Sequence, residues 1–112
     1  MNINIKSDGI WYHGSNLKIE VLRVGSTITQ WKELAEAFSH KPTRLSYEED
    51  GTITHNGQEM GYLYKIDEKI IVGEDVEQHP TTTMDVNAEF LTKRPLKLQL
   101  ISIHPLEEEN NE

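Results

Sequence analysis

Only one stretch of the chain has the residue spacing of an amphipathic helix, and this limits the fold more than any other feature of the sequence. Trp31, Leu34, Ala35 and Phe38 follow an i, i+3, i+4, i+7 pattern, which places them on one helix face. We expect Trp31 and Phe38 to be core residues of a fold that contains one clear helix.

The expected ends of this helix follow from its flanking residues. It should begin near Thr29, whose hydroxyl can cap the first free N–H groups, and run through Gln30 to about Ser39. Lys41-Pro42 should end it, because proline disfavours helical geometry in the residue before it.

The rest of the chain has the pattern of short strands separated by turns. Asp50-Gly51 and Asn56-Gly57 are typical of tight hairpin turns, because both supply residues that accept positive φ angles. The polar stretch 73–87 has no period and is expected to be one long loop. The expected strands are residues 10–13, 22–28, 43–47, 61–66, 69–72, 89–92 and 96–103.

These elements predict a β-rich α+β domain. Two small antiparallel sheets should pack face to face, with the helix flanking them and residues 10–13 on a central strand. Leu96, Leu98 and Leu100 alternate with polar residues, so we expect them to face the interior together.

Composition limits the size and the location of the domain. The chain has 112 residues, no cysteine and a formal charge of −8, with acidic residues concentrated at 107–112. We expect a single domain over residues 1–106 and an acidic, disordered tail over 107–112. The lack of cysteine and of any long apolar run predicts a cytoplasmic protein without a membrane span or secretory signal.

Several classes of site have no support in the sequence. The excess of acid argues against nucleic-acid binding. The five histidines do not have metal-ligand spacing, and no G-x-G-x-x-G, phosphate-loop or G-x-S-x-G motif is present.

His13 is the histidine with the most suggestive surroundings. It ends an apolar and aromatic segment, Ile10 to Tyr12, and precedes Gly14 and Ser15. A glycine there can let a flat ligand approach the backbone. The other interpretation is a partly exposed histidine at the end of a strand.

Four short motifs resemble, in their order, those of the ADP-ribosyltransferase superfamily. The match is closest to the H-Y-E branch, which includes the poly-ADP-ribose polymerases and the small rifampicin ADP-ribosyltransferases. The similarity covers about residues 10–103 and implies an ADP-ribosyltransferase-like fold with NAD as co-substrate. The four motifs are Trp11-Tyr12-His13-Gly14-Ser15, Gly25-Ser26-Thr27-Ile28-Thr29, Gly61-Tyr62-Leu63-Tyr64-Lys65-Ile66-Asp67, and Asn87-Ala88-Glu89-Phe90-Leu91-Thr92 before the last strand.

The resemblance implies roles for particular residues. His13 would bond a ribose of NAD, and the backbone of Gly14 would hold the nicotinamide carboxamide. Glu89 would be the catalytic acid, which bonds the ribose 2′-hydroxyl and stabilises positive charge at the anomeric carbon. Together the expected cofactor-binding residues are His13, Gly14, Ser15, Ser26 and Thr27.

The sequence departs from the H-Y-E pattern in two ways. No aromatic residue stands at 24–27, where that branch carries a tyrosine over the nicotinamide ring, and Ser26 and Thr27 are instead similar to the Ser-Thr-Ser motif of the arginine-motif toxins. The acid is also ambiguous, because in the rifampicin enzymes its position is closer to Asp75 than to Glu89. We expect Glu89 to be the acid.

Two other functions are compatible with the sequence. The domain could bind NAD or ADP-ribose without cleaving it, which the missing tyrosine favours. It could also be a structural or partner-binding β domain of a phage or toxin system. Tyr62 and Tyr64 alternate along one face of a strand, and we expect them to be core or interface residues and not ligand contacts. The sequence does not name an acceptor, which could be a protein or a small molecule.

Overall fold

The structure is a computed structural model, and a few short segments of the chain are outside its description. Lys41-Pro42, the two turn dipeptides Asp50-Gly51 and Asn56-Gly57, and the 107–112 tail lie outside the described residues. The described residues are 5–6, 8–40, 45–47, 52–55, 61–82, 84 and 87–104.

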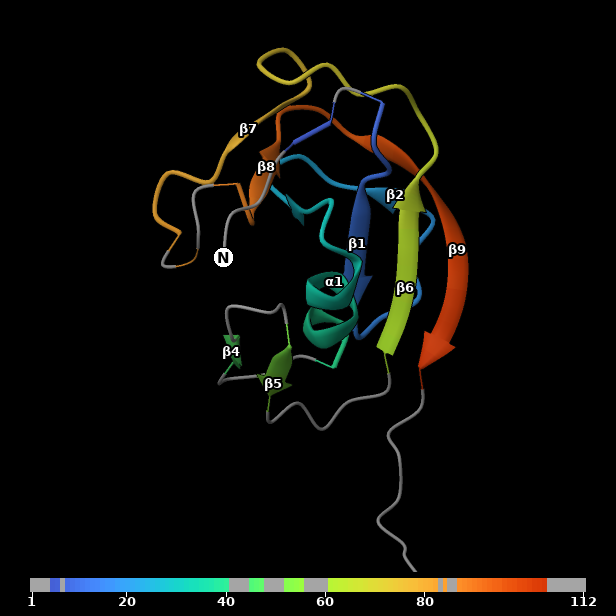
Figure 1. The fold of residues 1–112 in the computed structure, drawn as a ribbon. Coiled ribbons are helices and arrows are strands. Elements are labelled where there is room, and N and C mark those ends of the chain that lie inside the picture. The colour runs from blue at the N-terminus through green and yellow to red at the C-terminus, as the bar shows by residue number, and fades with distance from the viewer. Residues whose placement is uncertain are drawn as a thin grey trace, which may run out of the picture.

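Over the described residues the fold is α+β, with one helix and antiparallel sheets, as predicted (Figure 1). One sheet has the strand order β1-β6-β9-β2, another has the order β3-β8-β7, and β4 and β5 form a separate pair. The elements are β1 (Tyr12–Ser15), β2 (Val21–Leu22), β3 (Thr27–Ile28), α1 (Lys32–Phe38), β4 (Leu45–Tyr47), β5 (Ile53–His55), β6 (Gly61–Ile66), β7 (Val76–Gln78), β8 (Phe90–Thr92) and β9 (Leu96–His104).

β1 connects the two larger sheets. It lies at the end of the four-stranded order and not at its centre, so the prediction of a central strand was wrong. On its other side, Tyr12 exchanges two backbone hydrogen bonds with Thr29, of 2.7 and 3.0 Å. This bridge brings the end of β3 against β1 and forms a corner between the two sheets.

The chain between β1 and α1 forms two short strands where one long strand, 22–28, was predicted. Gly25 has a φ of +82°, a value that L side chains rarely adopt, and it turns the chain there. β2 therefore pairs with β9 in one sheet, while β3 pairs with β8 in the other.

The predicted 73–87 loop contains a strand, β7. The Val76 side chain is fully buried, and Val76 pairs with Thr92 of β8. The predicted strand at 69–72 is absent, since Val72 forms only an isolated bridge and Ile70 enters the core from an irregular segment.

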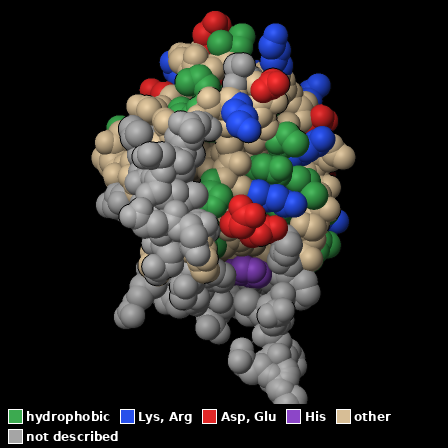
Figure 2. Space-filling model, in the orientation of Figure 1, with side chains coloured by type: hydrophobic (Ala, Val, Ile, Leu, Met, Phe, Trp, Pro, Cys, Tyr) green, Lys and Arg blue, Asp and Glu red, His purple; other side chains and the backbone are tan. Residues whose placement is uncertain are grey.

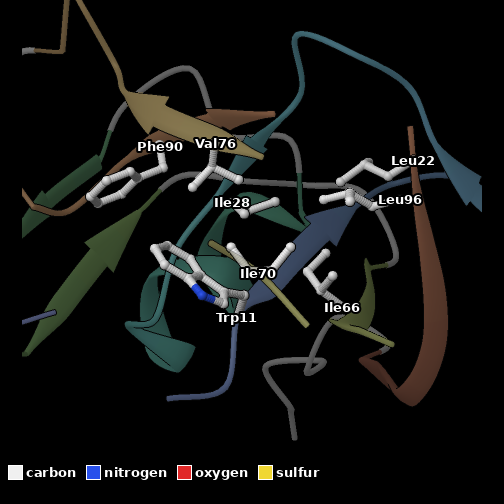
Figure 3. Close-up of a cluster of buried hydrophobic side chains, with 8 residues drawn as sticks. All are labelled: Trp11, Leu22, Ile28, Ile66, Ile70, Val76, Phe90 and Leu96. Carbon is white, nitrogen blue, oxygen red and sulfur yellow. The ribbon is translucent and has the colours of Figure 1, made fainter. Parts of the chain in front are cut away.

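Side chains from both larger sheets meet in one core (Figure 3), as two packed sheets require. Trp11 and Phe90 meet edge to face, with ring centroids 5.0 Å apart. Leu96 is buried in this core, but Leu100, at 36% exposure, extends past it, so the predicted inward face of β9 is only partly correct. The core residues are Trp11, Leu22, Ile28, Ile66, Ile70, Val76, Phe90 and Leu96.

Helix α1 begins at Lys32, later than predicted. The Thr29 hydroxyl accepts the N–H of Trp31 at 3.0 Å, and the N-cap residue, Trp31, has no side-chain cap. Leu34 and Ala35 lie on the buried face of the helix. Its outward face carries charged side chains, visible as adjoining blue and red atoms over α1 in Figure 2.

Candidate functional site

A cleft of ≈ 630 Å³ opens where β1, the 17–23 segment, β3 and the end of α1 come together. Its size is in the range of small-molecule sites. Every residue that the sequence motifs assign to the site lines this one cleft: His13, Gly14, Ser15, Ser26, Thr27 and Glu89.

His13 is held in one orientation by the neighbouring strand. Its Nδ1 lies 2.7 Å from the backbone carbonyl oxygen of Thr27. A carbonyl oxygen only accepts, so Nδ1 carries a proton and donates. Burial lowers the pKa of His13, which favours the neutral ring. In that tautomer Nε2 is a hydrogen-bond acceptor, which suits a ligand hydroxyl group.

Gly14 has a packing role that the sequence did not predict. A β-carbon at this position would lie 1.8 Å from the carbonyl oxygen of Ala35, so the glycine lets α1 pack directly on β1. Only the backbone of Gly14 is left to line the cleft. That a flat ligand approaches the backbone of Gly14 stays a prediction.

Ser26 and Thr27 line one side of the cleft, and hydrogen bonds hold their backbone in place. The Ser26 hydroxyl donates to the Arg23 carbonyl at 2.6 Å, and the Ser26 N–H donates to the Thr92 hydroxyl oxygen at 3.0 Å. Thr92 is buried and its hydroxyl donates to the same Arg23 carbonyl at 3.0 Å. The turn before β3 is thus fixed from both sides.

Glu89 brings the carboxylate to the cleft. It lies between two buried residues, Ala88 and Phe90, and its backbone carbonyl accepts the N–H of His79 at 3.1 Å. The Thr82 hydroxyl hydrogen-bonds Glu89 Oε1. Hydrogen bonds within the protein therefore hold both the backbone and the side chain of Glu89.

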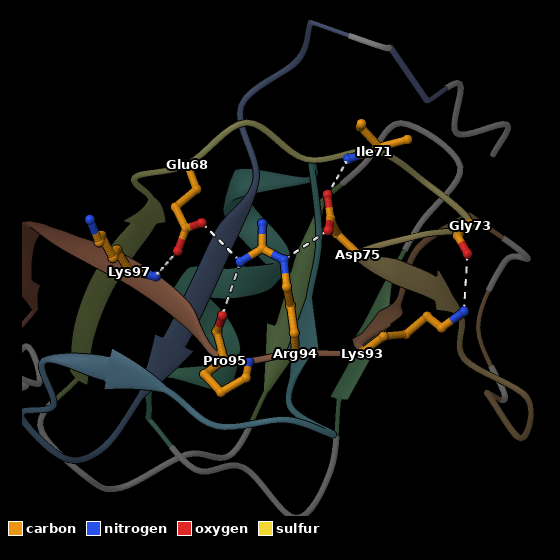
Figure 4. A network of polar contacts seen from close by, with 8 residues as sticks. All are labelled: Glu68, Ile71, Gly73, Asp75, Lys93, Arg94, Pro95 and Lys97. Atoms are coloured by element: carbon orange, nitrogen blue, oxygen red, sulfur yellow. Dashed lines mark hydrogen bonds and ion pairs between the residues drawn. The ribbon is translucent and has the colours of Figure 1, made fainter.

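Asp75, the alternative acid, is engaged elsewhere and does not line the cleft (Figure 4). Its carboxylate accepts hydrogen bonds from Arg94 Nε at 2.8 Å and from the Ile71 N–H at 2.8 Å. The bond from Arg94 has the largest effect on the pKa of Asp75, and both bonds lower it. Arg94 also pairs with Glu68 at 2.9 Å. This network joins the segments that follow β6, precede β7 and connect β8 to β9.

The apolar side of the cleft was not predicted. It is lined by Leu17, Ile19, Val21 and Phe38, and Leu17 is 61% exposed. Phe38 was predicted to be a core residue. It is partly buried against a second buried cluster, made of Trp31, Leu34 and Ala88, and it also lines the cleft. Its spacing in the sequence is that of an ordinary core residue, so no signal in the sequence points to a place in the cleft.

Tyr64 supports the apolar side from within the core, where its sequence pattern placed it. Its buried hydroxyl accepts the N–H of Ile19 at 2.8 Å and lies 3.3 Å from the Leu17 carbonyl oxygen, to which it donates. Ser15 adds a third contact, because its Oγ accepts the N–H of Leu17 at 3.0 Å. The 17–19 segment is therefore fixed to the sheet.

Neither a metal site nor a membrane-spanning helix is found in the described part of the chain. No group of three or more His, Asp or Glu residues there could hold a metal ion. None of the helices described is long and apolar enough to cross a membrane.

Comparisons of the chain with protein-family models, with curated proteins and with solved structures found no match. A function for the chain is therefore inferred from the geometry of the cleft and from the sequence motifs.

The half-buried, neutral His13 predicts a pH-dependent stability. The unfolded chain takes up a proton at His13 as the pH falls through about 6.5, whereas the folded chain resists protonation, so the free energy of unfolding should fall with the pH. The slope contributed by one such group is at most about 1.4 kcal/mol per pH unit. Urea unfolding measured as the pH falls below about 6.5 should show this decrease, and His13→Ala should reduce it; an unchanged slope in His13→Ala would contradict the assignment.

Proposed function

We propose that the cleft binds NAD and that the domain transfers ADP-ribose from NAD to an acceptor. The observation that carries this proposal is convergence: residues from three separate motifs, at 13–15, 26–27 and 89, line a single cleft. Their likeness to ADP-ribosyltransferase motifs predicts these positions, and His13 and Gly14 also stand out by their place at the end of an apolar segment. Their positions in the chain are up to 76 residues apart, since 89 − 13 = 76.

The polar side of the cleft suits a ribose ring. Neutral His13 offers Nε2 as an acceptor, and Glu89 offers a carboxylate, so each can accept a hydrogen bond from a ribose hydroxyl. Gly14 directly follows His13 and lines the cleft with its backbone, which is the candidate contact for the nicotinamide carboxamide.

The apolar side suits a flat ring. Phe38 is the aromatic residue that lines the cleft in the described part of the chain, and it comes from α1 and not from the strand before it. We assign to Phe38 the contact with the nicotinamide ring that a tyrosine makes in the H-Y-E branch. With this assignment, an aromatic side chain from the helix takes the place of the tyrosine that is missing at 24–27.

The proposed reaction breaks the bond between the anomeric carbon and the nicotinamide nitrogen. The bonding electron pair leaves with nicotinamide, and a lone pair of the acceptor forms the new bond to the anomeric carbon. The acceptor then loses a proton; with water as the acceptor, the products are ADP-ribose, nicotinamide and one proton. Glu89 would stabilise the positive charge that develops on the ribose as the first bond stretches.

The absence of an aromatic residue at 24–27 supports a second candidate. In this version the same cleft binds NAD or ADP-ribose and does not cleave the nicotinamide bond. The two versions predict the same ligand and differ only in turnover.

NAD should stabilise the fold. A ligand that binds only the folded state adds about 2.7 kcal/mol at a free concentration of about 100 times its Kd. Thermal unfolding followed with increasing NAD should show the rise in Tm, and His13→Ala should remove it without unfolding the free protein. His40→Ala is the matched control, because His40 is also half-buried and does not line the cleft. No change in Tm of the unmodified protein at millimolar NAD would contradict both versions.

A further inference from the structure

Thr82 contacts the cleft carboxylate from outside the cleft. It lies in the segment between β7 and β8, and its hydroxyl hydrogen-bonds Glu89 Oε1. A carboxylate only accepts, so the Thr82 hydroxyl is the donor. Thr82 itself is not among the residues that line the cleft, so any effect it has on a bound ligand passes through Glu89.

The direction of the Thr82 hydroxyl is fixed by a second contact. The N–H of Met84 donates to Thr82 Oγ1 at 3.1 Å. A threonine hydroxyl has one proton, and the Met84 contact uses an acceptor site of the oxygen. The proton is therefore available for Glu89, and the two contacts support one orientation of the hydroxyl.

The same segment also holds the backbone on either side of this contact. The N–H of His79 donates to the Glu89 carbonyl at 3.1 Å, and the N–H of Thr82 reaches the His79 carbonyl at 3.5 Å. With Ala88 and Phe90 buried, the backbone of Glu89 has little freedom to move. The remaining freedom of Glu89 is rotation about its side-chain torsions, and the hydrogen bond from Thr82 restricts this rotation.

We infer that Thr82 is a positioning residue, whose hydroxyl fixes Glu89 Oε1 so that Oε2 is directed to the ligand. The catalytic consequence of this inference rests on the proposed function. A carboxylate stabilises developing charge best when its position is set in advance, because no reorganisation is then needed during the reaction. Hydrogen bonds from a hydroxyl to a carboxylate are stronger than those between neutral groups, which suits this task.

The test compares variants at two adjacent threonines. Thr82→Val keeps the shape of the side chain and removes the hydroxyl, so kcat for nicotinamide release should fall roughly 10- to 100-fold, with a much smaller change in KM. Thr82→Ser should restore most of the rate. Thr81→Val is the matched control, because the exposed Thr81 hydroxyl contacts only His79 among the described side chains, and it should leave kcat unchanged.

A spectroscopic measurement separates this inference from the proposed function. The carboxyl ¹³C resonance of Glu89 should move in Thr82→Val and stay in place in Thr81→Val. If it moves but the unmodified protein releases no nicotinamide, Thr82 positions Glu89 and the transfer reaction is wrong. If the resonance stays in place in Thr82→Val, or if kcat is unchanged in an active protein, the inference is overturned.

Discussion

Glu89→Gln should lower the rate of nicotinamide release by about 10²–10³, equivalent to roughly 2.7–4 kcal/mol of transition-state stabilisation. The substitution preserves the size of the side chain, and the amide oxygen can still accept the hydrogen bond from Thr82. It removes the negative charge, which interacts more strongly with the developing positive charge than with NAD itself. NAD binding, followed by the rise in Tm, should therefore survive while the rate falls.

Asp75→Asn is the control for this prediction. Asp75 pairs with Arg94 and does not line the cleft, so its substitution should lower stability and leave the rate per folded molecule unchanged. The opposite pattern, with Asp75→Asn inactive and Glu89→Gln active, would show that the arrangement of the rifampicin enzymes applies here.

Gly14→Ala should lower the free energy of unfolding by about 3 kcal/mol, the upper part of the usual range for overpacking. The added methyl group would lie 1.8 Å from the Ala35 carbonyl and 2.8 Å from the Ser39 nitrogen, both backbone atoms of the helix region. The helix must therefore move away from β1 and take Phe38 with it. Urea unfolding measures the loss of stability, and the rise in Tm with NAD should shrink as well.

Gly25→Ala separates steric overlap from backbone strain. Gly25 has a φ of +82°, but no atom lies within 4 Å of a β-carbon built there. The expected cost is about 1 kcal/mol, from backbone strain alone. If Gly14→Ala costs no more than Gly25→Ala, the close packing of α1 on β1 is wrong.

The elements predicted best from the sequence are those with a clear period. The bounds of β6 agree with prediction, and β9 agrees to within one residue, because alternation or a continuous apolar run marks both strands. The helix was found from its apolar spacing, but its start was placed too early. Thr29 is held in a bridge to Tyr12, and this tertiary contact takes the place of the expected cap.

The errors come from contacts that local patterns do not encode. The strand predicted at 22–28 contains Gly25, whose positive φ sends β2 and β3 to different sheets. β7 was missed because only Val76 of its three residues is buried, and the partner that stabilises it, β8, follows only after the polar segment 79–89. A single buried residue does not produce the alternation of apolar and polar residues by which a strand is predicted.

The polar side of the site could be predicted, and its apolar side could not. His13, Ser26 and Glu89 stand in motifs with a recognisable order, and they line one cleft. Phe38 and Tyr64 have ordinary core spacing, and only the packing of α1 and the 17–19 segment brings their functions to light. The packing role of Gly14 was not predicted, because the sequence does not reveal which element packs on its α-carbon.

The central claim is that this cleft binds NAD and cleaves its nicotinamide bond. The most direct measurement is to incubate the purified full chain with NAD and to quantify free nicotinamide by chromatography, with His13→Ala and Glu89→Gln in parallel. If the cleft performs this reaction, the unmodified protein releases nicotinamide steadily, and release is strongly reduced in both variants. Release that is equal in all three proteins, or absent from the unmodified protein, would contradict it.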